Sequence, residues 1–355
     1  MSDVPHLRFP EFSGEWEKYT IGDLCEEFKS GKNIKAESIQ EEGVYPVFGG
    51  NGLRGYTDRY NHDGDYGLIG RQGALCGNVR FVTGKTYITE HAIAAKATND
   101  NYTRYLEYLF VRLNLGQFSD QSAQPGLAVN KLLKIETYVP SKAEQLKIAF
   151  LLRLLDERIA TQNKIIEDLK KLKSAIAETV FNNMQGHLTS LSAICNIVKG
   201  KQVNGEELSE KGKYYVMNGG ITPSGYYDQC NTPDNTISIS EGGNSCGYVQ
   251  YNKSSFWSGG HCYTLQDITC GVDIQYLFHY LKRYESNIMN LRIGTGLPNI
   301  QKKDLENFRI ALPPTNVQKE ISSCLTAIED KIMVEVKWLD CAQKEKQHLL
   351  RQMFI

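Results

Sequence analysis

The chain has 355 residues, of which 41% are hydrophobic and 23% are charged, and its net charge is −1. These values exclude wholesale disorder and a basic coat over the whole surface, so any contact with nucleic acid must come from local basic groups. The length predicts two or three domains.

Apolar runs and cysteines predict the compartment. No apolar run approaches the ~18 residues needed to span a membrane, and no secretory signal is visible at the N-terminus. The nine cysteines include no C-x-x-C pair, which indicates reduced thiols rather than a disulfide framework or a structural zinc site. We therefore expect a cytoplasmic protein with no membrane partner.

An internal repeat organises the chain. Placing Tyr45 on Tyr215, an offset of 170 residues, brings many further residues into register. The aligned pairs include Lys29 with Lys199, Gly49-Gly50 with Gly219-Gly220, His91 with His261, and Gly126-Leu127 with Gly296-Leu297. The period is too long for a solenoid, whose repeats run ~20–50 residues. The sequence therefore predicts two copies of one domain.

The predicted elements alternate along the chain. Each domain is rich in Gly, Asn, Tyr and β-branched residues and reads as mixed β-structure with turns. One short helix is expected in each, over Tyr102–Leu115 and over Ile274–Tyr284. A long helix follows each domain. The expected boundaries are 1–140 and 187–313 for the domains, and 141–186 and 314–355 for the long helices.

Sequence signals mark the ends of the long helices. Both helices start after a proline with a capping-box pattern, over Ser141–Glu144 and over Thr315–Gln318. In that motif the hydroxyl accepts from the N3 amide while the N3 side chain reaches back. The first helix is expected over about Lys142–Gln185, with Gly186 as its C′ residue.

Both long helices carry an apolar seam of coiled-coil period. The seam residues are Leu152, Leu155, Ile159, Ile166, Leu169, Ile176 and Val180 in the first helix, and Ile321, Leu325, Ile328, Ile332 and Leu339 in the second. A helix of over 40 residues is ~65 Å long, too long for one domain to cover. Packing the two helices on each other buries both seams, whereas the alternative is two separate amphipathic helices.

Catalytic motifs are absent from the sequence. It has no G-x-x-x-x-G-K-[ST] phosphate loop, no H-E-x-x-H, no G-x-S-x-G elbow and no [DN]-P-P-[YFW] tetrapeptide. His91 and His261 are equivalent in the repeat, but no Cys or Asp motif accompanies both. The favoured interpretation is a structural, hydrogen-bonded histidine in each copy. No metal ligand set is recognisable either.

Loops that suit a phosphate or a base edge recur in both copies. Each domain has a Lys/Gly stretch near its start, a Gly-Gly loop, a Gly-rich turn and a polar loop near its end. Hairpin turns would explain any one of them, but the set on two tandem copies favours binding. The candidate nucleic-acid contacts are Lys29, Ser30, Lys32, Asn51, Arg54, Arg71, Gln72 and Gln124 in the first domain, and Lys199, Lys201, Asn218, Thr222, Ser224, Asn244, Arg292, Thr295 and Asn299 in the second.

This organisation resembles the specificity (S) subunit of type I restriction–modification systems. Pro5–Phe12 resembles the start of that family, and Ile69–Gly77 resembles the R-G-x-x-G strand–turn of its recognition domains. Leu312–Ile321 resembles the L-P-P-x-x-E-Q-x-x-I start of its helices, which Val139–Ile148 matches in A-E-Q-x-x-I. The order of domain, helix, domain and helix covers the whole chain.

Two departures from the family pattern stand out. The glutamine of a G-x-x-Q-x-x-I segment is absent after Gly126-Leu127 and after Gly296-Leu297. The second copy also has Glu241 where the first has Arg71, which argues against a phosphate contact at that turn in the second domain.

The resemblance implies a fold and a function. The fold class is α+β, with two similar mixed α/β target-recognition domains separated by two long helices packed as an antiparallel coiled coil. Each domain would read one half of a bipartite site on double-stranded DNA, and the helices would set the gap and dock two methylation subunits. The chain itself would be non-catalytic and bind no cofactor. S-adenosylmethionine, ATP and Mg²⁺ are expected on the methylation and restriction subunits.

Two other classes of function stay open at this point. One is a stand-alone enzyme, such as a nuclease with unrecognised carboxylates. The other is a coiled-coil adaptor that joins proteins without reading DNA.

Overall fold

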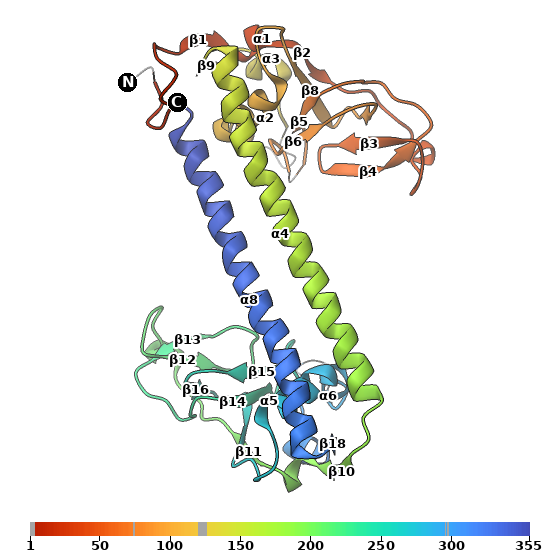
Figure 1. Ribbon diagram of the computed structural model, residues 1–355, viewed down its shortest axis with the longest axis vertical. Helices are drawn as coiled ribbons and strands as arrows, with labels where there is room; N and C mark the ends of the chain where they lie inside the picture. Colours follow the sequence, from red (N-terminus) through yellow and green to blue (C-terminus); the bar gives the residue numbers. More distant parts are fainter. Residues whose placement is uncertain (1–3, 74, 120–125, 295, 297) are drawn as a thin grey trace. The chain divides into compact units, whose positions relative to one another are not determined.

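The computed structural model describes residues 4–73, 75–119, 126–294, 296 and 298–355 (Figure 1). The chain divides into two units. Unit 1 comprises residues 1–162 and 338–355, and unit 2 comprises residues 163–337. Each unit contains one copy of the repeat and a part of both long helices, because each long helix belongs to both units.

Unit 1 contains nine strands within its described residues. They are β1 (Glu17–Thr20), β2 (Cys25–Ser30), β3 (Tyr45–Gly49), β4 (Gly52–Thr57), β5 (Tyr66–Gly70), β6 (Val79–Val82), β7 (Tyr87–Ile88), β8 (Ala92–Ala97) and β9 (Glu136–Val139). The strand orders are β2-β8-β5-β6 in the larger sheet, β4-β3-β7 in a smaller one, and β1-β9 in a pair. Only the β3–β7 pairing is parallel.

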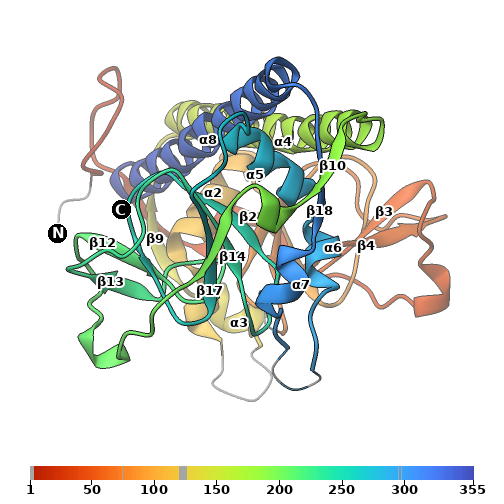
Figure 2. The ribbon, with the colours of Figure 1, turned by 90° about the horizontal axis from the view of Figure 1, so that it is seen from below.

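Unit 2 repeats this topology strand for strand. Its strands are β10 (His187–Ser190), β11 (Asn196–Lys199), β12 (Tyr214–Met217), β13 (Gly225–Tyr227), β14 (Thr236–Ser240), β15 (Val249–Asn252), β16 (Trp257–Ser258), β17 (Cys262–Gln266) and β18 (Arg309–Leu312). The orders are β11-β17-β14-β15, β13-β12-β16 and β10-β18. Figure 2 shows the sheet of β12 and β13 to one side of β14 and β17.

The short helical segments of the two units correspond, although two of them are α-helical in one unit and 3₁₀ in the other. Unit 1 has α1 (Ile21–Leu24), α2 (Thr103–Leu113) and α3 (Val129–Leu132), and unit 2 has α5 (Ile274–Arg283), α6 (Glu285–Met289) and α7 (Lys302–Glu306); the long helices are α4 (Lys142–Asn182) and α8 (Thr315–Gln352). Short 3₁₀ turns cover Ala36–Ser38, Leu115–Phe118, Leu191–Ala193 and Gly205–Glu207. The two predicted short helices are confirmed, since α2 and α5 lie within the expected ranges.

The hydrophobic core of each unit includes both long helices. In unit 1, the core around α2 includes Leu152 from the start of α4 and Phe354 from the end of the chain, and Phe354 stacks on Tyr105 with ring centroids 5.2 Å apart. In unit 2, the core around α5 includes Leu325 from α8 and Phe181 from the end of α4. Each copy therefore completes its core with the last turn of the helix that follows the other copy.

Ion pairs give the direction of the paired helices. In unit 1, Lys346 of α8 binds Asp156 of α4, and in unit 2, Lys173 of α4 binds Glu329 of α8 at 2.9 Å. From the first ion pair to the second, the residue number rises in α4, from 156 to 173, and falls in α8, from 346 to 329. The two helices therefore run antiparallel. The residues of the predicted apolar seams are all buried or half-buried, so the seams lie on the packed faces of α4 and α8.

The predicted capping boxes are wrong. The Glu144 carboxylate accepts two hydrogen bonds from Arg8, at 2.8 and 2.7 Å, and so holds the N-terminal segment instead of the helix start. The Thr315 hydroxyl donates to the Gly271 carbonyl. Both side chains thus serve tertiary contacts, which a local pattern does not reveal.

Buried glutamines fasten each domain to its long helix. Gln145 is 1% exposed; its Oε1 accepts from the Tyr102 amide at 3.0 Å, and its Nε2 donates to the Pro140 carbonyl at 3.0 Å. Gln318 makes the same two bonds, from the Asp273 amide and to the Pro313 carbonyl, both at 2.8 Å. The glutamine in the repeated helix-start motif is thus a structural clamp between helix and domain.

The first long helix ends earlier than predicted. Helix α4 ends at Asn182 rather than Gln185. Gly186 has no left-handed φ; a Cβ there would lie 2.7 Å from the Leu312 carbonyl carbon. Glycine is therefore needed because β10 and β18 approach each other closely.

The described helices include none that is long and apolar enough to cross a membrane.

The buried histidine of α5 predicts a pH dependence of stability. His279 is 3% exposed, its Nε2 lies 2.9 Å from Thr326 Oγ1, and burial lowers its pKa to about 4. The unfolded chain protonates this group near its ordinary value, so its contribution is full above about pH 6.5 and declines as the pH falls toward 4. We expect the free energy of unfolding of unit 2 to fall by about 2 kcal/mol between pH 7 and pH 5.

Urea unfolding at both pH values measures this loss. His279→Gln keeps a hydrogen-bonding side chain without the titration, so its loss between the two pH values should be smaller by about that amount. Equal losses in the two proteins would contradict the prediction.

Candidate DNA interface

Unit 1 presents a polar cleft at the ends of its larger sheet. The cleft has a volume of about 520 Å³. Three of the predicted contact residues line it, Asn51, Arg54 and Gln72, together with the Gly-Gly loop and His91. The amide, guanidinium and imidazole groups present both donors and acceptors to a ligand in the cleft.

Unit 2 presents an equivalent cleft of about 610 Å³. It is built from the Gly-Gly loop after β12, the Gly-rich turn after β14, His261, and the loop of Pro298 and Asn299 that precedes α7. Four predicted residues line it: Lys199, Asn218, Asn244 and Asn299. The repeat thus brings the same loops together twice, around different side chains.

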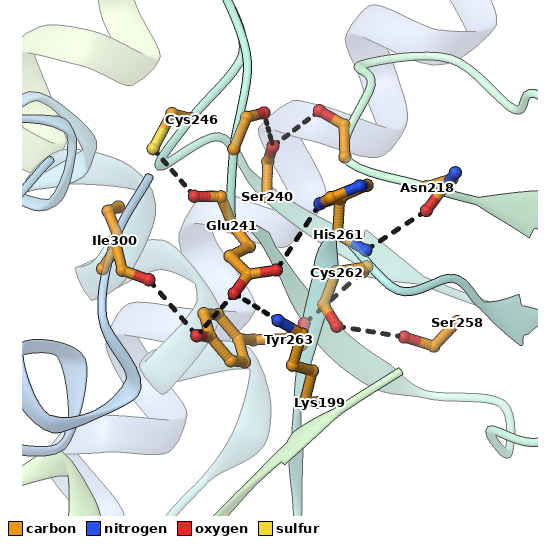
Figure 3. Close-up of polar contacts among 12 residues, drawn as sticks. Lys199, Asn218, Ser240, Glu241, Cys246, Ser258, His261, Cys262, Tyr263 and Ile300 are labelled. Atoms are coloured by element: carbon orange, nitrogen blue, oxygen red, sulfur yellow. Dashed lines mark hydrogen bonds and ion pairs between the residues drawn. The ribbon is translucent and has the colours of Figure 1, made fainter. Parts of the chain in front are cut away.

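A buried carboxylate, Glu241, is among the residues that line the second cleft, and Figure 3 shows the polar contacts around it. Glu241 is 8% exposed, and its Oε1 accepts from Lys199 Nζ at 2.6 Å and from the Tyr263 hydroxyl at 3.0 Å. Burial and this carboxylate raise the pKa of Tyr263, which therefore stays a neutral donor. Glu241 Oε2 lies 3.7 Å from His261 Nδ1 and makes no hydrogen bond with the described residues.

The first cleft has a different polar network. His91 Nδ1 lies 3.1 Å from Gln72 Oε1, and its Nε2 lies 3.4 Å from Glu90 Oε1. Lys29 lies outside the cleft lining and pairs with Glu27 at 3.2 Å. Buried Arg71 Nε has no hydrogen-bond partner among the described residues.

Main-chain contact explains the Gly-Gly loops. A Cβ on Gly50 would lie 2.7 Å from the His91 carbonyl oxygen, and one on Gly219 would lie 2.9 Å from that of His261. Gly219 also has a φ of +82°, which glycine adopts without strain. Each loop can therefore lie directly against the histidine that borders the cleft.

Strand pairing corrects the predicted repeat register in two places. Ser30 pairs with Ile93 as Lys199 pairs with Tyr263, so Ser30, not Lys29, is the equivalent of Lys199. A β-bulge between Cys25 and Glu27 causes this shift of one residue.

The second correction lies near the end of each domain. Gly126 bridges to Gln72, whereas Asn299 bridges to Gly242. Gly126 is therefore equivalent to Asn299 and not to Gly296. The second copy has extra residues upstream of this loop, because Gly77 lies against Gly116 whereas its equivalent Gly247 lies against Met289, already an offset of 173. An ungapped alignment cannot show such an insertion.

The other predicted contact residues lie outside the two cleft linings. Lys32, Lys201, Thr222, Ser224 and Arg292 are exposed, whereas Ser30 and Arg71 are half-buried. Gln124 and Thr295 lie outside the described residues.

The two histidines are the residues that the sequence interpretation missed. Their side chains are 46% and 65% exposed and line the clefts. His91 contacts Gln72 and His261 contacts Glu241, so the structural role expected from the sequence stays a prediction. Their equivalence in the repeat, next to glycine-rich turns, was the available signal. No group of three or more metal-ligating side chains occurs in the described part of the chain.

Two homologous domains, each with a polar cleft built from the same loops, define a tandem binding protein. The DNA specificity domain of type I restriction–modification systems matches the chain twice, at residues 13–171 and 188–337. The chain belongs to this family.

Individual relatives agree with this assignment. The EcoprrI specificity subunit of Escherichia coli is 38% identical over 180 residues, which are 50% of this chain and 44% of that protein. The putative specificity subunit S.MgeORF438P of Mycoplasma genitalium is 24% identical over 362 residues, 96% of this chain and 94% of that protein. The chain thus spans less than half of the first relative and nearly all of the second.

Solved structures share the fold. The crystal structure of a type I S subunit from M. genitalium has a TM-score of 0.82 at 22% identity and covers 99% of both chains. A chain from a study of type I complex assembly and conformational transition has a TM-score of 0.55 at 15% identity and covers 98% of both.

The Lys/Gly stretches predict a sharp effect of substitution. A Cβ on Gly200 would lie 2.2 Å from the Gly259 carbonyl oxygen, so the main chain beside Lys199 would have to move. We expect Gly200→Ala to cost about 1–3 kcal/mol of unfolding free energy. Gly205→Ala is the matched control, because no atom lies within 4 Å of its Cβ position. Equal midpoints of chemical unfolding for the two variants would contradict this account.

Proposed function

We propose that this chain is the DNA sequence-recognition subunit of a type I restriction–modification complex. The observation that carries the proposal is the pair of equivalent clefts, which keep one main-chain frame but differ in their polar side chains. A shared frame with variable hydrogen-bonding groups suits two domains that read two different base sequences. An adaptor without DNA readout has no use for such clefts.

Each domain would read one half of a bipartite site on double-stranded DNA. The near-neutral charge of the chain supports a complex in which partners share the neutralisation of phosphates. The antiparallel helices α4 and α8 would hold the domains at a set separation and so fix the non-specific gap. Their outer faces carry exposed apolar side chains, including Phe150 at 54% and Trp338 at 59%, and would dock two methylation subunits.

The chemistry would reside on the partner subunits. S-adenosylmethionine would bind the methylation subunits, and ATP and Mg²⁺ would bind the partners that carry out transfer, translocation or cleavage. This chain would carry no catalytic group of its own. The absence of the sequence motifs for these cofactors supports the assignment. The complex would work in the cytoplasm, where DNA and both cofactors are available.

Domain exchange tests this function. Replacing residues 15–140 with the same domain of a relative should change one half of the methylated motif and leave the other half intact. The cleft of unit 2 is lined by residues between Lys199 and Asn299, all of which lie outside the exchanged range. The measurement is the map of methylated bases in a host that expresses the complete operon. A change in both halves would overturn the modular assignment, and no sequence-specific methylation with either chain would overturn the function.

A further inference from the structure

Two repeat-equivalent side chains of opposite charge occupy the same main-chain frame. The amides of Arg71 and Glu241 both donate to the carbonyl of the cleft histidine at 2.9 Å. Their carbonyls accept from the Leu127 amide at 2.9 Å and from the Ile300 amide at 2.8 Å. The frame is therefore the same in both units, and only the side chain differs.

Both side chains have a buried polar atom that makes no hydrogen bond within the described residues. Arg71 Nε and Glu241 Oε2 are buried without a hydrogen bond to the described residues. A buried polar group without a partner costs about 1–3 kcal/mol, so its retention at equivalent positions points to a partner supplied from outside.

The surroundings preserve the difference in charge. Lys199 neutralises part of Glu241 in unit 2 through Oε1 and leaves Oε2 available. In unit 1 the equivalent residue is Ser30, which adds no charge beside Arg71. Unit 1 thus carries a guanidinium beside its cleft lining, where unit 2 carries a carboxylate within its cleft lining.

We propose that this position sets the hydrogen-bond polarity of one base in each half-site, an inference that rests on the proposed function. Arg71 would donate to the O6 and N7 acceptors of guanine, and Glu241 would accept from the exocyclic amino group of adenine or cytosine. His261 Nδ1 lies 3.7 Å from Oε2, and its side chain is 65% exposed. The ring would move aside when a base enters.

Base analogues test the assignment without altering the protein. The purified complex is titrated with duplexes that carry its mapped target, in which each base of the second half-site is replaced in turn by an analogue lacking the amino group. Purine replaces adenine, and 2-pyrimidinone replaces cytosine. At one base pair the affinity should fall on the order of 10- to 100-fold. In the first half-site, 7-deazaguanine should weaken binding at one guanine.

Protein variants identify the side chain responsible. Glu241→Ala should abolish the sensitivity to the missing amino group, whereas the control His261→Ala should keep it. Arg71→Ala should abolish the sensitivity to 7-deazaguanine. If Glu241→Ala unfolds, Glu241→Gln keeps the size of the side chain and should reduce the sensitivity at least several-fold.

Two outcomes would overturn the inference. Full sensitivity to the missing amino group in Glu241→Ala would show that another group reads the base; if that variant unfolds, the same result in Glu241→Gln would show it. Loss of the sensitivity in both Glu241→Ala and His261→Ala would mean that the contact does not belong to Glu241 alone. Wild-type binding that prefers the target but ignores every analogue would also overturn it while leaving the proposed function intact. Binding that does not distinguish the target from a scrambled duplex would instead overturn the proposed function.

Discussion

Closure of each domain core by the far end of a long helix is the constraint on which the structure depends. Phe354 at the end of the chain completes the core of unit 1, and Phe181 at the end of α4 completes that of unit 2. Large buried aromatic side chains of this kind stabilise a core by several kcal/mol. Each core therefore contains residues from the start of one long helix and from the end of the other.

The two copies share their main-chain structure and differ in the side chains that line their clefts. The main chain repeats, since strand order, the parallel pair in each small sheet and the glutamine clamps are the same. The side chains that line the clefts differ, from Gln72 and Arg54 in one to Glu241 and three asparagines in the other. The strands thus form a fixed scaffold that positions the loops, as is common where binding residues lie on loops.

The sequence predicted the features that depend on periodicity and failed where tertiary contact decides. The repeat, both short helices and the apolar seams follow from local patterns, and the structure confirms them. The role of Glu144 depends on Arg8, far away in the chain, and the register at Lys199 depends on a β-bulge. The place of His91 and His261 in the cleft linings did not follow from the sequence, because exposure cannot be read from a single residue. Among the predicted contacts that line the clefts, most lie on the glycine-rich loops, and of the flanking Lys/Gly stretches only Lys199 does so among the described residues. Arg71, Thr222 and Ser224 lie outside the linings although they are close to those loops in the sequence.

The central claim is that two clefts on one chain read two separate short sequences at a distance fixed by the helices. Single-molecule sequencing of methylated bases in a host that expresses the intact operon tests it most directly. The account predicts one motif with two specific halves separated by a gap of constant length and no sequence preference. A single contiguous motif, or two halves at variable spacing, would contradict it.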